Sequence, residues 1–212
     1  MFNAEKFIEK TIPKLQRDIQ RKALIAFSGG VDSTVCAALV NKAIGDRLIA
    51  VHVDTGYMRK NEPKQVKQMM EDLSLSYRFV DASNEYYAAL KGVEDPEMKR
   101  KIIGEKFIRI FEKVAREEKI DCLVQGTIAP DWIESGGGLR DTIKSHHNVG
   151  GLPKDMKLKL AEPLRDLYKD EVRKVARVLH LKVSERQPFP GPGLAIRIIG
   201  EPTPERTELV RE

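Results

Sequence analysis

The chain has 212 residues, of which 41% are hydrophobic and 33% are charged, and its formal net charge is +5. This ordinary composition, with 15 glycines and 11 prolines, excludes collagen-like and disordered chains. No apolar run approaches the roughly 18 to 20 residues that span a membrane, so we expect no membrane partner. The two cysteines stand alone in the sequence and form neither a disulfide framework nor a zinc site, which favours a cytoplasmic location.

Strands and helices alternate along the sequence. Residues 1–21 are charged and helical in pattern, and short apolar runs predict strands at 23–27, 48–53, 77–80, 122–125 and 158–162. Five helices are expected. One ends at Gly45, one begins at Asn61 and one begins at Ser83, and the last two run from Asp95 to Glu118 and from about Lys169 to Leu179. This alternation is typical of an α/β fold, a parallel sheet with helices on both faces. The carboxyl ends of the strands share one edge, where ligands collect.

Residues 28–34, with the sequence SGGVDST, lie between the first strand and the helix that follows it. Two glycines let the backbone approach an anion closely, and the start of the helix offers free N–H groups. Ser28, Ser33 and Thr34 add hydroxyl donors, whereas the carboxylate of Asp32 suits a Mg²⁺ ion that neutralises phosphate. The lysine of a Walker A loop and the third glycine of a dinucleotide fingerprint are both missing. The sequence therefore predicts a phosphate loop of neither common kind.

Residues 126–157 show no clear periodicity, which in a compact domain indicates a lid, a binding loop or a disordered stretch. Glycine clusters could serve as hinges and the basic residues suit a polyphosphate, so we expect a lid, with a merely flexible insertion as the alternative. His146 and His147 are interpreted as lid residues rather than zinc ligands, because adjacent positions do not share one side of a helix or strand. Cys36 and Cys122 are interpreted as small core residues.

The sequence SGGVDS after a strand resembles the pyrophosphate loop of the N-type ATP pyrophosphatases, which cleave ATP between its α and β phosphates and adenylate an acceptor. Five further stretches resemble one group of that family, the GMP synthetases: DPEMKRKIIG at 95–104, QGTI at 125–128, PDWIES at 130–135, IKSHHNVGGLP at 143–153 and PFPGPGL at 188–194. We expect no glutamine amidotransferase domain before these motifs. The resemblance is therefore to the synthetase subunit of the two-subunit archaeal type.

The resemblance implies an adenine nucleotide α-hydrolase-like fold and a reaction in two steps. ATP would adenylate xanthosine 5'-monophosphate (XMP) with release of pyrophosphate, and ammonia from a separate glutaminase subunit would then displace AMP to give GMP. The implied cofactor is Mg²⁺, and the implied substrates are ATP and XMP. A homodimer is expected for the full-length chain, and no nucleic acid partner is expected.

The resemblance also implies roles for single residues. Asp32 and Lys144 are expected to be catalytic, Asp32 through Mg²⁺ and Lys144 through the charge that develops in the transition state. Arg100 matches a substrate-binding arginine of the family, and Glu134 and Ser135 are expected to shape the substrate pocket. The residues expected to bind ATP are Ser28, Gly29, Gly30, Val31, Asp32, Ser33, Thr34, Val53 and Gly126.

Three parts are expected along the chain: an N-terminal helix at 1–21, an ATP pyrophosphatase domain at 22–187 with its lid at about 126–157, and a last part at 188–212. This last part resembles the start of a truncated α+β dimerisation domain. Within it, residues 194–201 predict a strand and residues 203–205 the start of a helix.

Two other interpretations stay open. Another enzyme with the same loop, an NAD synthetase or a tRNA-thiolating enzyme, would share residues 28–33. Thiolation normally needs a reactive cysteine pair at the strand edge, and an NAD synthetase would have to lack the motifs at 143–153 and 188–194. A non-catalytic nucleotide- or RNA-binding module would suit the positive charge, although 13 aromatic residues (1 Trp, 5 Tyr, 7 Phe) offer few stacking surfaces.

Overall fold

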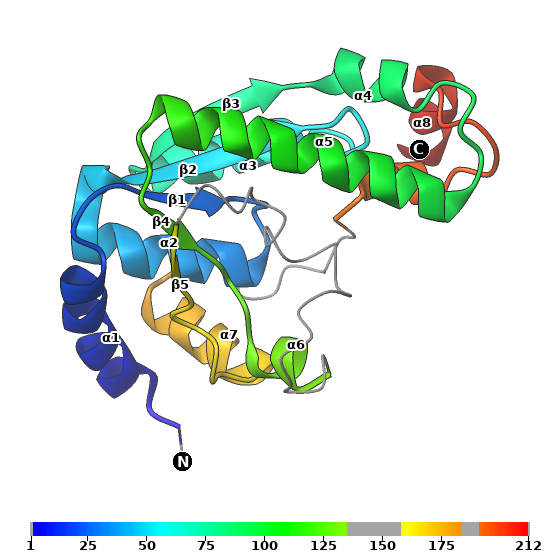
Figure 1. The fold of residues 1–212 in the computed structure, drawn as a ribbon. Coiled ribbons are helices and arrows are strands. Elements are labelled where there is room, and N and C mark those ends of the chain that lie inside the picture. The colour runs from blue at the N-terminus through cyan, green and yellow to red at the C-terminus, as the bar shows by residue number, and fades with distance from the viewer. Residues whose placement is uncertain (1, 135–157, 184–190, 212) are drawn as a thin grey trace.

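The protein is described by a computed structural model over residues 2–134, 158–183 and 191–211. Within these residues the chain forms one sheet of five parallel strands in the order β3-β2-β1-β4-β5 (Figure 1). The strands are β1 (Ala23–Ala26), β2 (Leu48–Asp54), β3 (Ser76–Asp81), β4 (Cys122–Val124) and β5 (Lys159–Ala161). Each strand prediction is confirmed to within one residue at either end.

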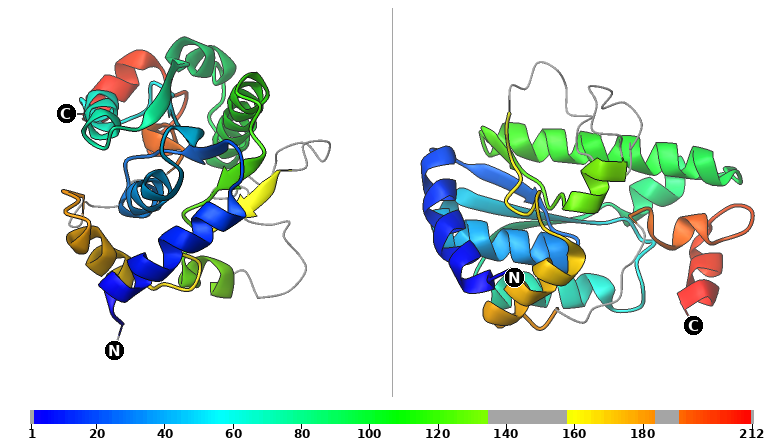
Figure 2. Two further views of the ribbon diagram at one scale, coloured as in Figure 1. Left: turned by 90° about the vertical axis from the view of Figure 1, so that its left-hand side faces the viewer. Right: turned by 90° about the horizontal axis from the view of Figure 1, so that it is seen from below.

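Helices cover both faces of the sheet, as Figure 2 shows from two further sides. One face carries α2 (Val31–Ile44), α3 (Glu62–Asp72) and α7 (Lys169–Val178), with α1 (Ala4–Asp18) packed against α2 and α7. The other face carries α4 (Ser83–Ala89) and α5 (Pro96–Glu117). The short helices are η1 (Gly45–Arg47), α6 (Ala129–Glu134), η2 (Gly193–Ile196) and α8 (Pro204–Arg211). None of the helices in the described ranges is long and apolar enough to cross a membrane.

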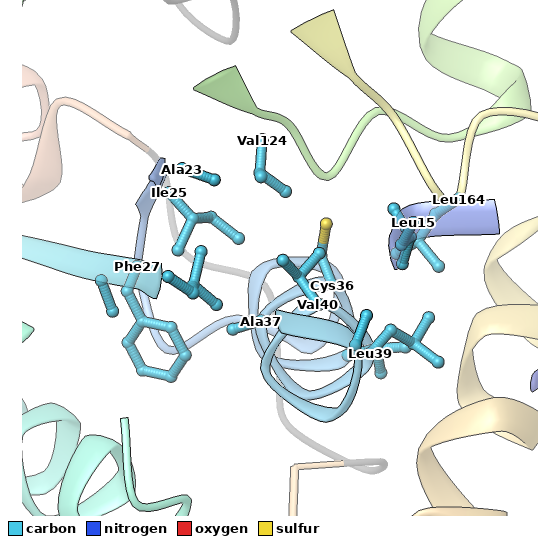
Figure 3. Packing of buried hydrophobic residues seen from close by; sticks show 14 of the residues in the cluster. Leu15, Ala23, Ile25, Phe27, Cys36, Ala37, Leu39, Val40, Val124 and Leu164 are labelled. Atoms are coloured by element: carbon cyan, nitrogen blue, oxygen red, sulfur yellow. The ribbon is translucent and has the colours of Figure 1, made fainter. Parts of the chain in front are cut away.

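Successive side chains of the strands enter two apolar clusters, one on each face of the sheet. Ala23 and Ile25 of β1 are buried in the same cluster as Leu39 of α2, and Figure 3 shows these three residues together. Leu24, between them in the sequence, is buried in the second cluster with Phe111 of α5. Because both faces are covered, each strand has to be apolar at nearly every position, which is the pattern that predicted the α/β fold.

The order of the strands reverses between β1 and β4. After β1 the chain builds β2 and β3 on one side, and it then returns through α5 to place β4 on the other side of β1. At such a point the loops after the two neighbouring strands leave in opposite directions and open a crevice in which ligands bind. The loops after β1 and β4 are the predicted phosphate loop and the segment that begins with Gln125 and Gly126.

The C-terminal segment 191–211 lies at the same end of the molecule as the first turn of α5 (Figure 1). The strand expected at 194–201 is wrong, because the chain there forms η2 and a turn. The carbonyl groups of Ile198 and Gly200 accept hydrogen bonds from Lys99 of α5, where a strand would need a neighbouring strand. The helix expected from residues 203–205 is confirmed as α8. The dimerisation domain stays a prediction.

The structure describes residues 126–134 of the expected lid. They include α6, in a stretch where the sequence shows no clear periodicity. The rest of the expected lid, with both of its histidines, lies outside the described residues.

Candidate functional site

The predicted phosphate loop begins where β1 ends. The N–H of Phe27 still donates to the carbonyl of Val51 on β2 (2.8 Å), and the chain then turns away at Gly29, whose φ of +72° favours glycine. Gly30 is the N-cap of α2, and its carbonyl accepts the N–H of Thr34 at 3.0 Å. The first N–H groups of α2 and the positive end of its dipole therefore stand at the carboxyl edge of the sheet.

Three hydroxyl groups stabilise this loop. The Oγ of Ser28 accepts the N–H of Gly30 at 3.3 Å and lies 3.0 Å from the Oγ of Ser33. The hydroxyls of Ser33 and Thr34 donate to the carbonyl of Gly30 at 3.1 and 2.7 Å. Thr34 is buried and uses its one hydroxyl proton in this bond, so that it shapes the loop here. Its expected contact with ATP stays a prediction.

Asp32 carries the carboxylate of the loop, on the first turn of α2. Its Oδ2 accepts a hydrogen bond from the Nζ of Lys169 at 2.6 Å. Its Oδ1 is buried and has no hydrogen-bond partner among the described residues. A buried carboxylate oxygen without a partner is unfavourable until a cation or a donor joins it. The carboxylate of Asp32 therefore fits the Mg²⁺ that the sequence predicts.

In the part of the chain that the structure describes, no group of three or more His, Cys, Asp or Glu residues could hold a metal ion by itself. Mg²⁺ is usually held by one or two carboxylates together with substrate phosphates and water. A metal role for Asp32 stays a prediction.

Sequence reasoning missed Lys169. This residue opens α7, and α7 follows β5, so Lys169 reaches the carboxyl edge of the sheet 137 positions after Asp32. The available signal was a lysine at the predicted start of a helix that follows a parallel strand. The sequence did not show which loop this lysine meets, because that depends on the packing of α7 against α2.

Gly126 follows β4 and passes close to the first turn of α2. A Cβ at this position would lie 3.3 Å from the carbonyl carbon of Asp32 and 3.4 Å from the amide nitrogen of Ser33. Because these neighbours are backbone atoms, a methyl group here would require the loop or β4 to shift by a few tenths of an ångström. The Sγ of Cys36 also donates to the carbonyl of Gln125 (3.5 Å), which joins α2 to the end of β4. The predicted ATP-binding residue Gly126 thus lies beside the loop.

Val53 is buried near the end of β2, opposite Val80 of β3. The carbonyl of Val51 faces β1, where it accepts the N–H of Phe27. Backbone groups alternate in direction along a strand, so Val53, two residues on, turns its N–H and C=O to the same side, past the end of β1. The backbone of Val53 therefore faces the side of β2 on which the phosphate loop starts.

The structure describes only some of the residues that are expected to bind the substrate or to act in catalysis from the lid. Arg100 lies in the first part of α5, is partly exposed and forms an ion pair with Glu97. No hydrogen bond or ion pair joins Arg100 to the phosphate loop within the described ranges. Glu134 is the last residue of α6. Ser135 and Lys144 lie outside the described residues.

Both cysteines are buried, which confirms the prediction that they are core residues. Burial raises the pKa of the Cys36 thiol, and the nearby negative charges of Asp32 and Glu162 raise it further. Burial also raises the pKa of Cys122 to about 11, with a further contribution from Asp121. Figure 3 shows Cys36 on the side of α2 that faces the strands. Because a thiolate is the reactive form, neither residue is suited to nucleophilic catalysis.

Residues 2–129 match the family model described as NAD synthase. The solved structure of an NMN synthetase from Francisella tularensis superposes with a TM-score of 0.70 at 15% identity, covering 91% of this chain and 78% of that one. An NH3-dependent NAD synthetase from Campylobacter jejuni gives a TM-score of 0.65 at 16% identity, covering 89% of this chain and 80% of that one. These structures share the parallel sheet with its covering helices, and they confirm the predicted adenine nucleotide α-hydrolase-like fold.

Much closer relatives are known by sequence. The chain is 59% identical over 216 aligned residues to a subunit of the glutamine-hydrolyzing GMP synthase of Methanopyrus kandleri, an alignment that covers 100% of this chain and 68% of that protein. It is 58% identical to the protein of the same name from Archaeoglobus fulgidus, over 99% of this chain and 69% of that protein. The chain therefore belongs to the family of these GMP synthase subunits.

Proposed function

We propose that the chain catalyses the ATP-dependent amination of XMP to GMP. XMP is first adenylated with release of pyrophosphate, and ammonia from a separate glutaminase subunit then displaces AMP. The observation that carries the proposal is the 59% identity to a GMP synthase subunit along the whole chain, phosphate loop included. The chain is accordingly an ATP-binding ligase of purine biosynthesis. The solved NAD and NMN synthetases, at 15 and 16% identity, support the fold alone.

The first step of the reaction requires stabilisation of the negative charge on the leaving pyrophosphate. The carbonyl oxygen at position 2 of XMP is a poor leaving group, and it becomes a good one once it carries an adenylyl group. The oxygen attacks the α-phosphorus of ATP, the bond between the α-phosphorus and the bridging oxygen breaks, and pyrophosphate leaves with its charge. Preorganised N–H groups and cations are the devices that lower the barrier of such a step. The loop at 28–33 and Lys169 supply both kinds of group at one place.

Lys169 has a position that suits a phosphate ligand. Its ammonium is held by Asp32 at 2.6 Å, at the start of α2, and its side chain is still 43% exposed. A lysine on a flexible stem can turn from a carboxylate to a nearby polyphosphate without a change in the backbone. We therefore place Lys169 next to the pyrophosphate that leaves.

Mg²⁺ is the cofactor in this proposal, held by Asp32 and by the phosphates of ATP. When bound, the ion supplies positive charge that withdraws electrons from the phosphates. The carboxylate of Asp32 would then be neutralised by the ion, and Lys169 would be released for the phosphates. Both oxygens of Asp32 support this assignment, since one is buried without a partner among the described residues and the other accepts a hydrogen bond from Lys169.

We assign the residues that contact the adenine of ATP and those that contact XMP to the same edge of the sheet. The backbone of Val53 faces the side of β2 on which the phosphate loop starts, which supports its predicted contact with ATP, and we assign this contact to the adenine. Arg100 is proposed to bind the acceptor, as are Glu134 and Ser135. Lys144 is proposed to stabilise charge in the transition state from the lid. These four assignments rest on the motifs that carry them.

The proposed partners follow from the names of the relatives. A protein named as one subunit of a glutamine-hydrolyzing synthase implies another subunit that hydrolyses glutamine, and we propose that this other subunit delivers ammonia to the chain. A homodimer and a cytoplasmic location are proposed from the family resemblance.

The test is release of pyrophosphate from Mg·ATP with ammonium, measured with XMP, with deamido-NAD and with no acceptor. The proposal predicts release that requires XMP, with GMP formed in equal amount. Release that requires deamido-NAD would assign the chain to NAD synthesis instead. RNA affinity that falls steeply with salt, without any turnover, would favour a binding module.

A further inference from the structure

A buried lysine lies one residue before the proposed substrate arginine. Lys99 is in the first part of α5, has no exposed surface, and forms no ion pair with a carboxylate among the described residues. Its Nζ donates to the carbonyls of Ile198 (2.8 Å) and Gly200 (2.6 Å) in the C-terminal segment. Burial lowers the pKa of Lys99, whereas the nearby negative charges of Glu94 and Asp95 raise it and the positive charge of Arg206 lowers it. Burying a charge that no carboxylate contacts directly is unfavourable, so this arrangement needs a reason.

The segment that Lys99 holds is folded around two cations. Arg206 of α8 donates to the carbonyls of Ile199 (3.4 Å) and Glu201 (3.0 Å), so four successive carbonyl groups, from 198 to 201, face Lys99 or Arg206. Gly200 has a φ of +77°, and a Cβ there would lie 2.6 Å from a guanidinium nitrogen of Arg206. The turn at 198–201 is therefore specific for these two side chains.

The same segment is attached to the turn that follows β2. The N–H of Leu194 donates to the carbonyl of Tyr57 (2.7 Å), and the hydroxyl of Tyr57 donates to the carbonyl of Pro202 (2.9 Å). Arg211 donates to the carbonyls of Gly56 and Met58 at 2.7 and 2.8 Å. This turn, residues 55–58, begins two residues after Val53, so it lies directly beyond the part of β2 that we assign to the adenine.

Part of the C-terminal segment, residues 193–211, thus joins two elements at the carboxyl edge of the sheet that do not follow each other in the chain. Lys99 connects it to the first part of α5, where Arg100 lies, and Tyr57 connects it to the turn after β2. The side chains of the phosphate loop form their bonds elsewhere, since Ser28 and Ser33 bond within the loop and Asp32 bonds to α7.

We propose that Lys99 is a positioning residue, which fixes segment 193–211 between α5 and the turn after β2 and thereby sets the affinity for the acceptor nucleotide. This inference rests on the proposed function for its substrate, and on the contacts above for its mechanism. The chemistry at the α-phosphorus of ATP is unaffected, since Lys99 bonds to the C-terminal segment and not to Asp32 or Lys169.

The experiment compares Lys99→Met with Lys99→Arg, which keeps a cationic donor, and with Lys101→Met, an exposed lysine on the same helix. The first readout is amide hydrogen exchange. Lys99→Met should speed exchange at 194–203 and at the turn 55–58, leave β1 and β2 protected, and be partly restored in Lys99→Arg. Wild-type exchange at 194–203 in Lys99→Met would overturn the proposal. So would a uniform increase over the whole chain, which indicates a general loss of stability.

The second readout is steady-state kinetics. Lys99→Met should raise the KM for XMP about tenfold with kcat and the KM for ATP nearly unchanged, the scale expected when a binding group is misplaced by a fraction of an ångström. Lys101→Met should behave as wild type. A raised KM for XMP with wild-type hydrogen exchange would mean that Lys99 contacts the substrate itself, and would overturn a positioning role.

This design distinguishes a failure of the proposed function from a failure of the role proposed for Lys99. If the wild-type chain does not use XMP, the proposed function fails, and hydrogen exchange still decides whether Lys99 holds the segment. If Lys99→Met does not fold, Lys99→Gln takes its place, since its shorter neutral amide keeps a polar group at the site without the ammonium that bonds to both Ile198 and Gly200. Lys99→Gln should give the same pattern of exchange, and wild-type exchange at 194–203 would again refute the proposal.

Discussion

Replacing Lys169 by methionine should strongly reduce turnover while it leaves the free energy of unfolding nearly unchanged. The ion pair between Lys169 and Asp32 has side chains that are 43% and 29% exposed, so water screens much of its attraction. Pairs of this kind contribute about 0.2 to 1 kcal/mol to the free energy of unfolding. A positive group that stabilises a leaving pyrophosphate contributes far more, and its removal slows turnover by roughly 10² to 10³. We therefore expect Lys169→Met to keep its fold and to lose nearly all XMP-dependent release of pyrophosphate.

The matched control is Lys174→Met on the same helix. Lys174 forms an ion pair with Asp170 at 3.5 Å, its side chain is 46% exposed, and it lies more than one helical turn further along α7. Thermal unfolding measures stability, and coupled detection of pyrophosphate measures turnover. Both variants should unfold within a few degrees of wild type. Wild-type turnover in Lys169→Met would refute a role at the phosphates, and a large loss of stability would make the residue structural.

Three further results are expected. Asp32→Asn should keep the fold, as judged by circular dichroism, and reduce Mg·ATP-dependent turnover by at least about 10²; near-normal turnover would remove Asp32 from the metal site. Gly126→Ala places a Cβ 3.3 Å from the backbone of Asp32 and should slow turnover about tenfold, and an unchanged rate would show that the loop adjusts freely. With a pKa of about 11 for Cys122, only roughly 0.1% of that thiol is ionised at pH 8, so alkylation in the native protein should be slow for this residue and slower still for Cys36, and fast only after unfolding.

The sequence predicted the phosphate loop because the signal is local. Glycines at 29 and 30, followed by a helix start, can be recognised without any knowledge of the rest of the molecule, and the structure places Gly30 as the N-cap of α2. The failed strand at 194–201 shows the opposite case. A run such as Leu194–Ile199 is apolar enough for a strand, but a strand also needs a partner, and here Lys99 supplies the donors instead.

The role of glycine at position 126 shows how much depends on packing. In the sequence it is one glycine in the motif QGTI, and only the approach of β4 to α2, with 3.3 Å to the backbone of Asp32, shows that a side chain there would press on the loop. Burial of Cys36 and Cys122 followed from their apolar neighbours in the sequence. The rise in their pKa values comes first from this burial, and the fold adds the negative charge of Glu162 near Cys36.

The sequence by itself determined the order of strands and helices, the parallel sheet and the loop that faces phosphate, because periodicity, glycines and helix caps act over a few residues. Only the tertiary structure decided which distant residues meet at the carboxyl edge. It brings Lys169 to Asp32 across 137 positions and Lys99 to Gly200 across 101. Contacts of this kind depend on the strand order and on the packing of helices against the sheet, and no local pattern in the chain encodes them.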